Sequence, residues 1–201
     1  MPEIANNMLA TTSDNKMNSF QNYLLIAMPS MEDPYFSRSV TYICEHNEQG
    51  AMGLVINQPA GMSLKELINQ TDKEAIVDDE KAENIVLAGG PVSQDRGFIL
   101  HTTQPGWSAS LALTSEIMVT TSKDILSSLG NSEAPEKSIV TLGYAGWSAG
   151  QLEEEIRANS WLMVEADTEL LFDTPIHKKW EAAVHKLGID TWQIAPTAGN
   201  A

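Results

Sequence analysis

The feature of this sequence that most constrains the fold is a series of short apolar segments separated by turns that contain glycine or proline. The segments are roughly four to eight residues long, which is the length of a strand rather than of a buried helix. Many are rich in β-branched and aromatic residues, which favour strands. We predict about eight strands, over residues 22–28, 39–45, 51–57, 84–88, 97–101, 117–120, 138–143 and 161–164.

About four segments carry helical patterns with recognisable first residues, namely 64–70, 122–129, 149–159 and 175–187. Ser63 and Ser148 are each followed three residues later by Glu or Gln, which predicts a capping box at both helix starts. Thr121 and Thr174 are the predicted N-caps of the other two helices. Gly188 is predicted to end the last helix.

Hairpins and strand–helix–strand units alternate along the chain, so we predict the α+β class with a mixed, largely antiparallel sheet. A length of 201 residues fits one domain or two small ones. We assign residues 20–195 to a single compact domain. The polar, aperiodic residues 1–19 are predicted to be a loose tail, and residues 196–201 a short C-terminal tail.

The chain is acidic, with 27 Asp and Glu against 12 Lys and Arg and a net charge of -15. Proteins that bind nucleic acid draw much of their affinity from neutralising phosphates with Lys and Arg. The longest basic cluster is Lys178-Lys179, so direct nucleic-acid binding is disfavoured. The acidic charge is explained by solubility, and it is also compatible with binding to a protein partner.

The sequence also bears on location. No apolar run approaches the roughly 18 residues that a membrane span needs, and the first residues lack the basic and apolar regions of a signal peptide. The one cysteine, Cys44, cannot form an internal disulfide. These features predict a cytoplasmic protein with no membrane association.

The segment GYAGWSAGQLEEEI, residues 143–156, places three glycines within eight residues between a predicted strand and a predicted helix. Phosphate-binding loops share this layout, but the spacing matches neither G-x-x-x-x-G-K-[ST] nor G-x-G-x-x-G. The three glutamates that follow would oppose a bound phosphate at the helix start. A hydrophobic staple of Trp147 with Leu152, next to the capping box, gives a structural explanation. Ligand binding at Gly146 is the alternative.

No segment matches a catalytic or metal-binding motif, so we predict no catalytic residue, no metal and no cofactor. His177 and His185 are about two helical turns apart, which exceeds the H-x₃₋₅-H spacing of metal ligands. Cys44 lies two residues before His46. A redox role for Cys44 is kept as a minor option, and it requires an exposed thiol with a depressed pKa.

Arg38 and Arg96 are the most informative candidates for a binding site. Each stands at the entrance to a predicted strand and follows an acidic loop, so a local ion pair would explain them structurally. The functional alternative is that the two guanidinium groups line one anion pocket. Asn57 and Gly146 would join this pocket if the loops that carry these residues converge.

Several segments form a recognisable set in chain order. They are NYLLIAMP at 22–29, DPYFSRSV at 33–40, GAMGLVIN at 50–57, GGPV at 89–92 with DRGF at 95–98, and GYAGW at 143–147 with QLEEE at 151–155. Together they resemble the bacterial YqgE/AlgH family, over residues 17–194. The resemblance implies a compact α+β domain with unusual strand connectivity, but no established activity and no agreed catalytic residues. Some members carry the label of transcriptional regulator, from an association with alginate control.

Three kinds of function are compatible with these features. We favour a non-catalytic cytosolic regulatory or binding protein that acts through a protein partner or a small anion. The alternative is an enzyme, or a nucleotide- or anion-binding protein, whose pocket is lined by Arg38 and Arg96. A nucleic-acid-binding transcriptional regulator is the least favoured, because the basic surface that it needs is missing.

Overall fold

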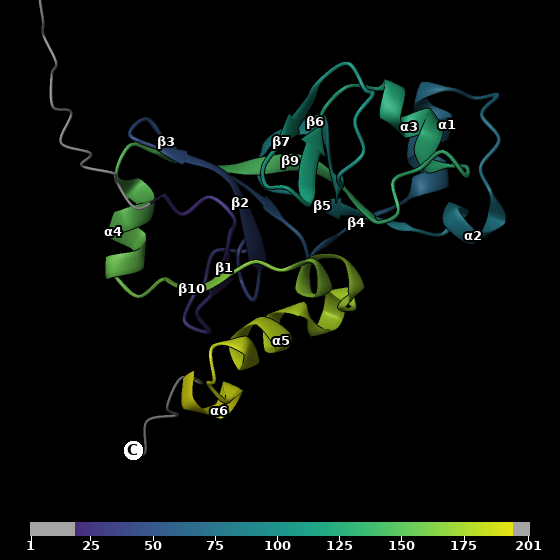
Figure 1. Cartoon of the computed structure of the whole chain (residues 1–201). Helices are drawn as coiled ribbons and strands as arrows, with labels where there is room; N and C mark the ends of the chain where they lie inside the picture. The colour runs from purple at the N-terminus through teal and green to yellow at the C-terminus, as the bar shows by residue number, and fades with distance from the viewer. Residues whose placement is uncertain (1–18, 195–201) are drawn as a thin grey trace, which may run out of the picture.

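The computed structural model describes residues 19–194, which form a bent β-sheet covered by short helices (Figure 1). The predicted tails lie outside the described residues, except for Ser19, whose hydroxyl donates to the His46 carbonyl at 3.0 Å. The strands are β1 (Tyr23–Ala27), β2 (Val40–Asn47), β3 (Gly50–Val55), β4 (Pro59–Ser63), β5 (Ile85–Ala88), β6 (Val92–Thr102), β7 (Ser110–Ala112), β8 (Ile117–Thr120), β9 (Ser138–Ser148) and β10 (Trp161–Glu165).

Helical segments connect these strands and cover them. They are α1 (Leu64–Thr71), α2 (Asp79–Ala82), α3 (Asp124–Leu129), α4 (Gln151–Arg157), the π-helical turn η1 (Glu169–Asp173), the 3₁₀ turn η2 (Ile176–Lys178), α5 (Lys179–Lys186) and α6 (Thr191–Ile194). The α+β class is therefore confirmed. The short elements β4, β7, α2, α6 and η1 were not predicted.

The strand order is β10-β1-β2-β3-β9-β6-β8-β7, with β5 added to β9 and β4 to β5. Only the β5–β9 pair is parallel within the described part of the chain. The predicted mixed, largely antiparallel sheet is thus confirmed. Neighbours such as β3 and β9 are distant in sequence, which accounts for the unusual connectivity.

Strand β9 joins the two halves of the sheet, one built from β10, β1, β2 and β3 and the other from β4, β5, β6, β7 and β8. Along one edge, Thr141 and Leu142 pair with β5, and the stretch from Ala145 to Ser148 pairs with β3. The opposite edge pairs with β6. The change of partner along β9 falls at Gly143, which has a φ of +74°.

The half of the sheet built from β10, β1, β2 and β3 is buried on both faces. On one face, Leu24 and Ile26 of β1 belong to a core that includes Trp180 of α5. On the other face, Leu25 packs in a core with Leu152 of α4. Because alternate residues of a strand point to opposite faces, burial on both sides explains the unbroken apolar run in β1. Helices α1 and α3 cover the other half, where Ile68 and Ile125 pack with β5, β6 and β9.

The predicted capping boxes had different outcomes. At α1 the prediction is confirmed, because the Ser63 hydroxyl accepts the Glu66 N–H while the Glu66 carboxylate accepts the Ser63 N–H. At α4 it is wrong. Ser148 is still part of β9, where it pairs with Gly50 of β3. The N-cap of α4 is instead Gly150, whose φ of +78° turns the chain into the helix. Ser148 instead donates to the Gln151 side chain.

The other two predicted N-caps are also wrong. Helix α3 begins at Asp124, three residues after Thr121. The Asp124 carboxylate accepts the N–H and the hydroxyl of Ser108, in the loop between β6 and β7. The Thr174 hydroxyl donates to the Glu169 carbonyl at the end of η1, and a 3₁₀ turn precedes α5. The predicted end of this helix is confirmed, since Gly188 follows the C-cap of α5 with a φ of +72°.

Candidate functional site

The glycines of two motif segments lie against each other and leave no room between them for a ligand. Gly89 and Gly90 follow β5, and Gly143 lies within β9. A Cβ at Gly90 would come within 2.2 Å of the Tyr144 carbonyl carbon, and one at Gly143 within 2.5 Å of the Gly90 oxygen. Only glycine lets two backbones approach this closely. The role of the segment around Gly143 is therefore to let the chain after β5 pack directly on β9, and we call this contact the crossing.

This crossing shapes the adjacent strand β6. Its pairing with β9 jumps from Val92–Tyr144 to Gly97–Leu142, so residues 93–96 of β6 bulge opposite the single residue Gly143. We call residues 93–96 the Arg96 bulge. Bulges re-aim side chains and are enriched beside functional sites. Here the bulge presents Arg96 at the surface.

Arg96 lies between two adjoining cavities. Its guanidinium carbon is 5.4 Å from the centre of the Phe98 ring. Both cavities are lined by Arg96 and Thr121, and their volumes are about 530 and 490 Å³. The larger one is mainly apolar, and its wall includes Met52, Phe98, Leu111, Val119 and Tyr144. The smaller one is more polar, and its wall includes Ser93, Asp95, Thr121, Ser122 and Lys123.

The structure does not bring Arg38 to this place. The Arg38 guanidinium stacks on the Trp180 ring at 4.4 Å, and Arg38 lines neither cavity beside Arg96. Asn57 accompanies Arg38: its Oδ1 accepts the Val40 N–H at 2.8 Å and its Nδ2 donates to the Arg38 carbonyl at 2.9 Å. Gly146 is exposed on β9 and pairs with Met52, at the margin of the apolar cavity.

The glutamates after the glycine-rich segment have structural partners. Glu155 Oε2 accepts the indole N–H of Trp147 at 2.9 Å and that of Trp161 at 2.8 Å. Glu153 Oε1 lies 2.9 Å from His46 Nε2. His46 Nδ1 accepts the Phe20 N–H, so Nε2 carries the proton and donates to Glu153.

Cys44 has neither property that a redox role requires. The residue is buried, and burial raises the pKa of its thiol to about 12, with a smaller contribution from the nearby Glu45. Its sulfur lies 3.9 Å from the Tyr42 carbonyl. A thiol with such a pKa stays protonated at neutral pH and is a poor nucleophile.

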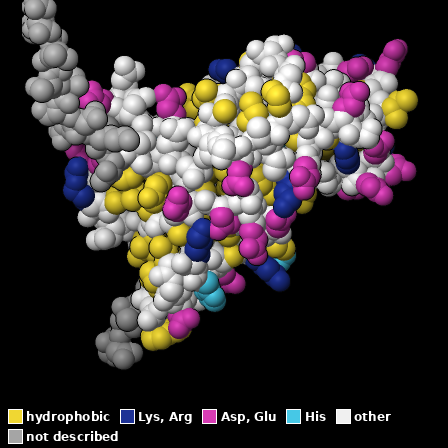
Figure 2. All heavy atoms as spheres, viewed as in Figure 1, with side chains coloured by type: hydrophobic (Ala, Val, Ile, Leu, Met, Phe, Trp, Pro, Cys, Tyr) yellow, Lys and Arg dark blue, Asp and Glu magenta, His cyan; other side chains and the backbone are white. Residues whose placement is uncertain are grey.

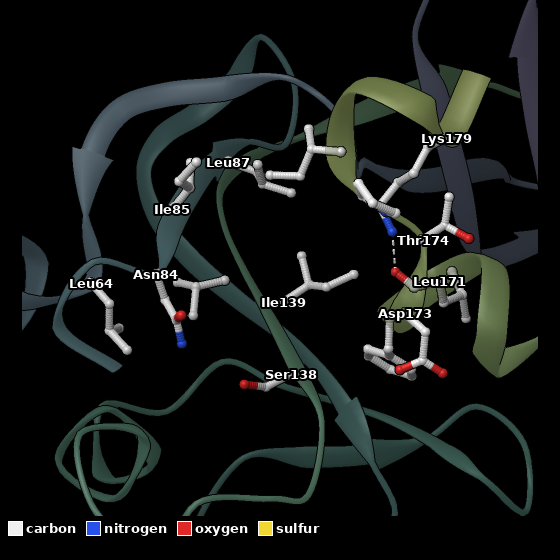
Figure 3. A pocket seen from close by; sticks show the side chains of 14 residues that line it. Leu64, Asn84, Ile85, Leu87, Ser138, Ile139, Leu171, Asp173, Thr174 and Lys179 are labelled. Carbon is white, nitrogen blue, oxygen red and sulfur yellow. Dashed lines mark hydrogen bonds between the residues drawn. The ribbon is translucent and has the colours of Figure 1, made fainter. Parts of the chain in front are cut away.

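A buried lysine that was not predicted from the sequence lies beside a third cavity, of about 280 Å³ (Figure 3). Lys179, the first residue of α5, is only 3% exposed. Burial lowers the pKa of its amine to about 8, and the nearby Asp173 partly offsets that effect. The one signal in the sequence was its place one helical turn before Ala183, on the buried face.

Among residues 19–194, no group of three or more His, Cys, Asp or Glu side chains is arranged to hold a metal ion. In the same residues, no helix combines the length and the apolar character needed to cross a bilayer.

Known proteins resemble this chain over nearly its whole length. A UPF0301 protein of Pseudoalteromonas translucida is 56% identical over 185 residues, which cover 92% of this chain and 100% of that protein. A UPF0301 protein of Shewanella loihica is 51% identical with the same coverage.

Two solved structures are also similar to this chain. The solution structure of the AlgH protein from Pseudomonas aeruginosa is 43% identical, with a TM-score of 0.75 over 92% of this chain and 97% of that one. A Corynebacterium diphtheriae protein, 21% identical with a TM-score of 0.65 over 88% and 91% of the two chains, shares the fold. A family model described as AlgH-like matches residues 24–192. The chain belongs to the AlgH-like family.

Proposed function

We propose that this chain is a non-catalytic, cytosolic binding protein that holds a small anion with an apolar portion at the Arg96 bulge. The observation that carries the proposal is the position of Arg96 between an apolar and a polar cavity, with no ion-pair partner among residues 19–194. An unpaired guanidinium beside an apolar chamber suits a phosphate or carboxylate joined to a hydrophobic group.

The polar cavity supports the same ligand chemistry. Lys123 adds a second cation, and Thr121 adds a hydroxyl group that can donate to an anion. Asp95 also lines this cavity, so the cations there exceed the carboxylates by one. The neighbouring Asp124 carboxylate is already hydrogen-bonded to Ser108 and Ser122.

A protein partner that presents such an anion is the second form of this proposal. The same cavities would then take an acidic or phosphorylated side chain together with an apolar neighbour. Nucleic acid fits less well, because Lys and Arg on the visible face are interspersed with Asp and Glu (Figure 2) and the chain has 27 acidic against 12 basic residues. Our proposal differs from the anion pocket predicted from the sequence, because it places the anion at Arg96 and not between Arg38 and Arg96.

The test is ligand binding by matched arginine variants. Wild type, Arg96→Met and Arg38→Met are titrated with alkyl and aryl phosphates, the corresponding carboxylates, nucleotides and inorganic phosphate, by calorimetry and thermal unfolding. Arg38 is the matched control, since both arginines are exposed and stack on an aromatic ring. A true ligand at 100 times its Kd should add about 2.7 kcal/mol to the free energy of unfolding.

We expect this gain in wild type and Arg38→Met, and its loss in Arg96→Met. Inorganic phosphate should bind more weakly than the alkyl and aryl phosphates, because it leaves the apolar cavity empty. The proposal fails if no anion stabilises the wild type, or if the two arginine variants lose binding equally.

A further inference from the structure

The cavity beside Lys179 is separate from the two cavities at Arg96, since the two sets of lining residues do not overlap. It lies between the edge of β5, the first residues of β9 and the η1–α5 segment. In Figure 3, Lys179 and Leu171 stand on one side, Ile85 and Leu87 on the other, and Ile139 lies between them. The wall is mixed, with polar and apolar atoms contributing about equally to its surface, and its polar side chains are Asn84, Ser138, Asp173, Thr174 and Lys179.

The hydrogen bonds of Lys179 match the donors of a neutral amine. Its Nζ donates to the Leu170 carbonyl at 3.0 Å and to the Leu171 carbonyl, both in the π-helical turn η1. A neutral amine has two N–H groups and one lone pair, whereas an ammonium has three N–H groups. The two carbonyls therefore accept both N–H groups of the neutral amine. The lone pair of the nitrogen is left without a hydrogen-bond partner. A third N–H would have no acceptor among the described residues and would be costly to bury.

Lys179 thus combines burial, two fixed N–H groups and a free lone pair with an adjoining cavity. Lysines placed in apolar pockets act as nucleophiles toward carbonyl compounds for this reason. The low pKa of the amine, about 8, agrees with this arrangement, because it leaves roughly a tenth of the amine as free base at pH 7. We propose that the cavity is a site at which a small, uncharged aldehyde or ketone forms an imine with Lys179.

The charges and size of the cavity set the ligand class. The one carboxylate in the wall, Asp173, forms an ion pair with Lys137 at 2.6 Å. The cavity therefore offers no unpaired charge to a charged ligand, which favours an uncharged one. The volume of about 280 Å³ and the apolar side of the wall, which includes Ile85, Leu87 and Ile139, suit a short hydrocarbon chain. Asn84 and Ser138 can donate hydrogen bonds to an oxygen elsewhere on the ligand.

The reaction requires no oxidant or reductant. The Lys179 nitrogen attacks the carbonyl carbon and forms a C–N bond. Its two amine protons leave with the carbonyl oxygen as one water molecule, and a C=N bond replaces the C=O bond. After uptake of a proton from solvent, the imine keeps one N–H for a carbonyl of η1.

The experiment traps this imine in the intact protein. Wild type is incubated at pH 7 with butanal and sodium cyanoborohydride, and the labelled lysines are located by peptide mass mapping over time. Lys178 is the internal control, since it is the adjacent residue and is exposed. An amine with a pKa near 8 has about 200-fold more free base at pH 7 than an ordinary lysine, so we expect Lys179 to be labelled at least about 10-fold faster than Lys178.

Two further measurements distinguish the cavity from amine reactivity alone. Ser138 lies on the wall of the cavity and is exposed, so Ser138→Tyr should fill the cavity and reduce labelling of Lys179 to the rate of Lys178. In urea, wild type should lose the preference for Lys179. Equal labelling of the two lysines in the folded protein, or unchanged labelling of Lys179 in folded Ser138→Tyr, would overturn the proposal. The result does not depend on whether Arg96 binds an anion.

Discussion

Gly90 lies so close to Tyr144 that a Cβ atom at Gly90 would come within 2.4 Å of three backbone atoms of Tyr144 and Ala145. Backbone atoms in paired strands cannot move aside as a side-chain tip can. The two glycine-rich segments are therefore parts of one crossing, and the crossing carries the bulge that exposes Arg96.

The first prediction concerns this crossing. Gly90→Ala should lower the free energy of unfolding by at least about 3 kcal/mol, because the clash adds to a φ of +151°. Gly97→Ala is the matched control on β6, since its Cβ would meet no atom within 4 Å, and we expect a change below about 1 kcal/mol. Urea titration measures both. Similar losses in the two variants would show that the close approach is not what demands glycine.

The second prediction concerns the carboxylate between two tryptophans. Glu155→Ala leaves the indole N–H groups of Trp147 and Trp161 without their acceptor, and both rings are buried. We expect a loss of about 2–4 kcal/mol in unfolding free energy and a change in tryptophan fluorescence. Glu154→Ala, an exposed neighbour on the same helix, should have little effect. Equal effects of the two substitutions would contradict the assignment.

The third prediction is a dependence of stability on pH. Hydrogen bonds from Ser122 and then Ser108 lower the pKa of Asp124 from 3.8 to about 2. Because the folded state has the lower pKa, the ionised carboxylate stabilises the fold above pH 4, and this contribution disappears as the pH falls from about 4 to about 2.

Asp124→Asn should therefore differ most from wild type at neutral pH and least near pH 2, as measured by urea titration across that range. Asp95→Asn, another exposed aspartate, serves as the control for the loss of one surface carboxylate. A constant difference between Asp124→Asn and wild type at every pH would refute this assignment.

The fourth prediction separates structure from binding at Asn57. Asn57→Ala removes the bonds to Val40 and Arg38 that hold the loop before β2, so we expect a loss of about 1–3 kcal/mol in unfolding free energy. Gln58→Ala, which removes one long contact of 3.4 Å to the Ser37 carbonyl, should cost less. Binding of anions at Arg96 should be unchanged in both variants. Loss of that binding in Asn57→Ala would restore Asn57 to the binding site.

Local patterns in the sequence predicted the features that depend on local contacts. The strands with β-branched runs and the Ser63 capping box involve neighbours in the chain, and both were predicted. The cap at Ser148 failed because pairing with Gly50 of β3 keeps Ser148 in the strand, which no local pattern reveals. Strands β4 and β7 were missed for the same reason, since each is held by its partner strand more than by its own composition.

The candidate site depended on long-range contacts even more. Arg38 and Arg96 have similar sequence surroundings, yet Arg38 stacks on the distant Trp180 of α5, whereas Arg96 lies over Phe98 of its own strand. The bulge that presents Arg96 arises where β6 meets Gly143. The buried amine of Lys179 depends on the carbonyls of a π-helical turn, which the sequence did not predict.

The place of β9 in the sheet has a consequence for how the chain is made. Strands β3, β5 and β6 all pair with β9, but its residues, 138–148, leave the ribosome long after theirs. During that interval the earlier strands have unpaired edges, which are prone to pairing with other chains. We expect the nascent chain to need protection by chaperones until β9 emerges, and substitutions that slow the docking of β9 to reduce the yield of folded protein before they affect its final stability.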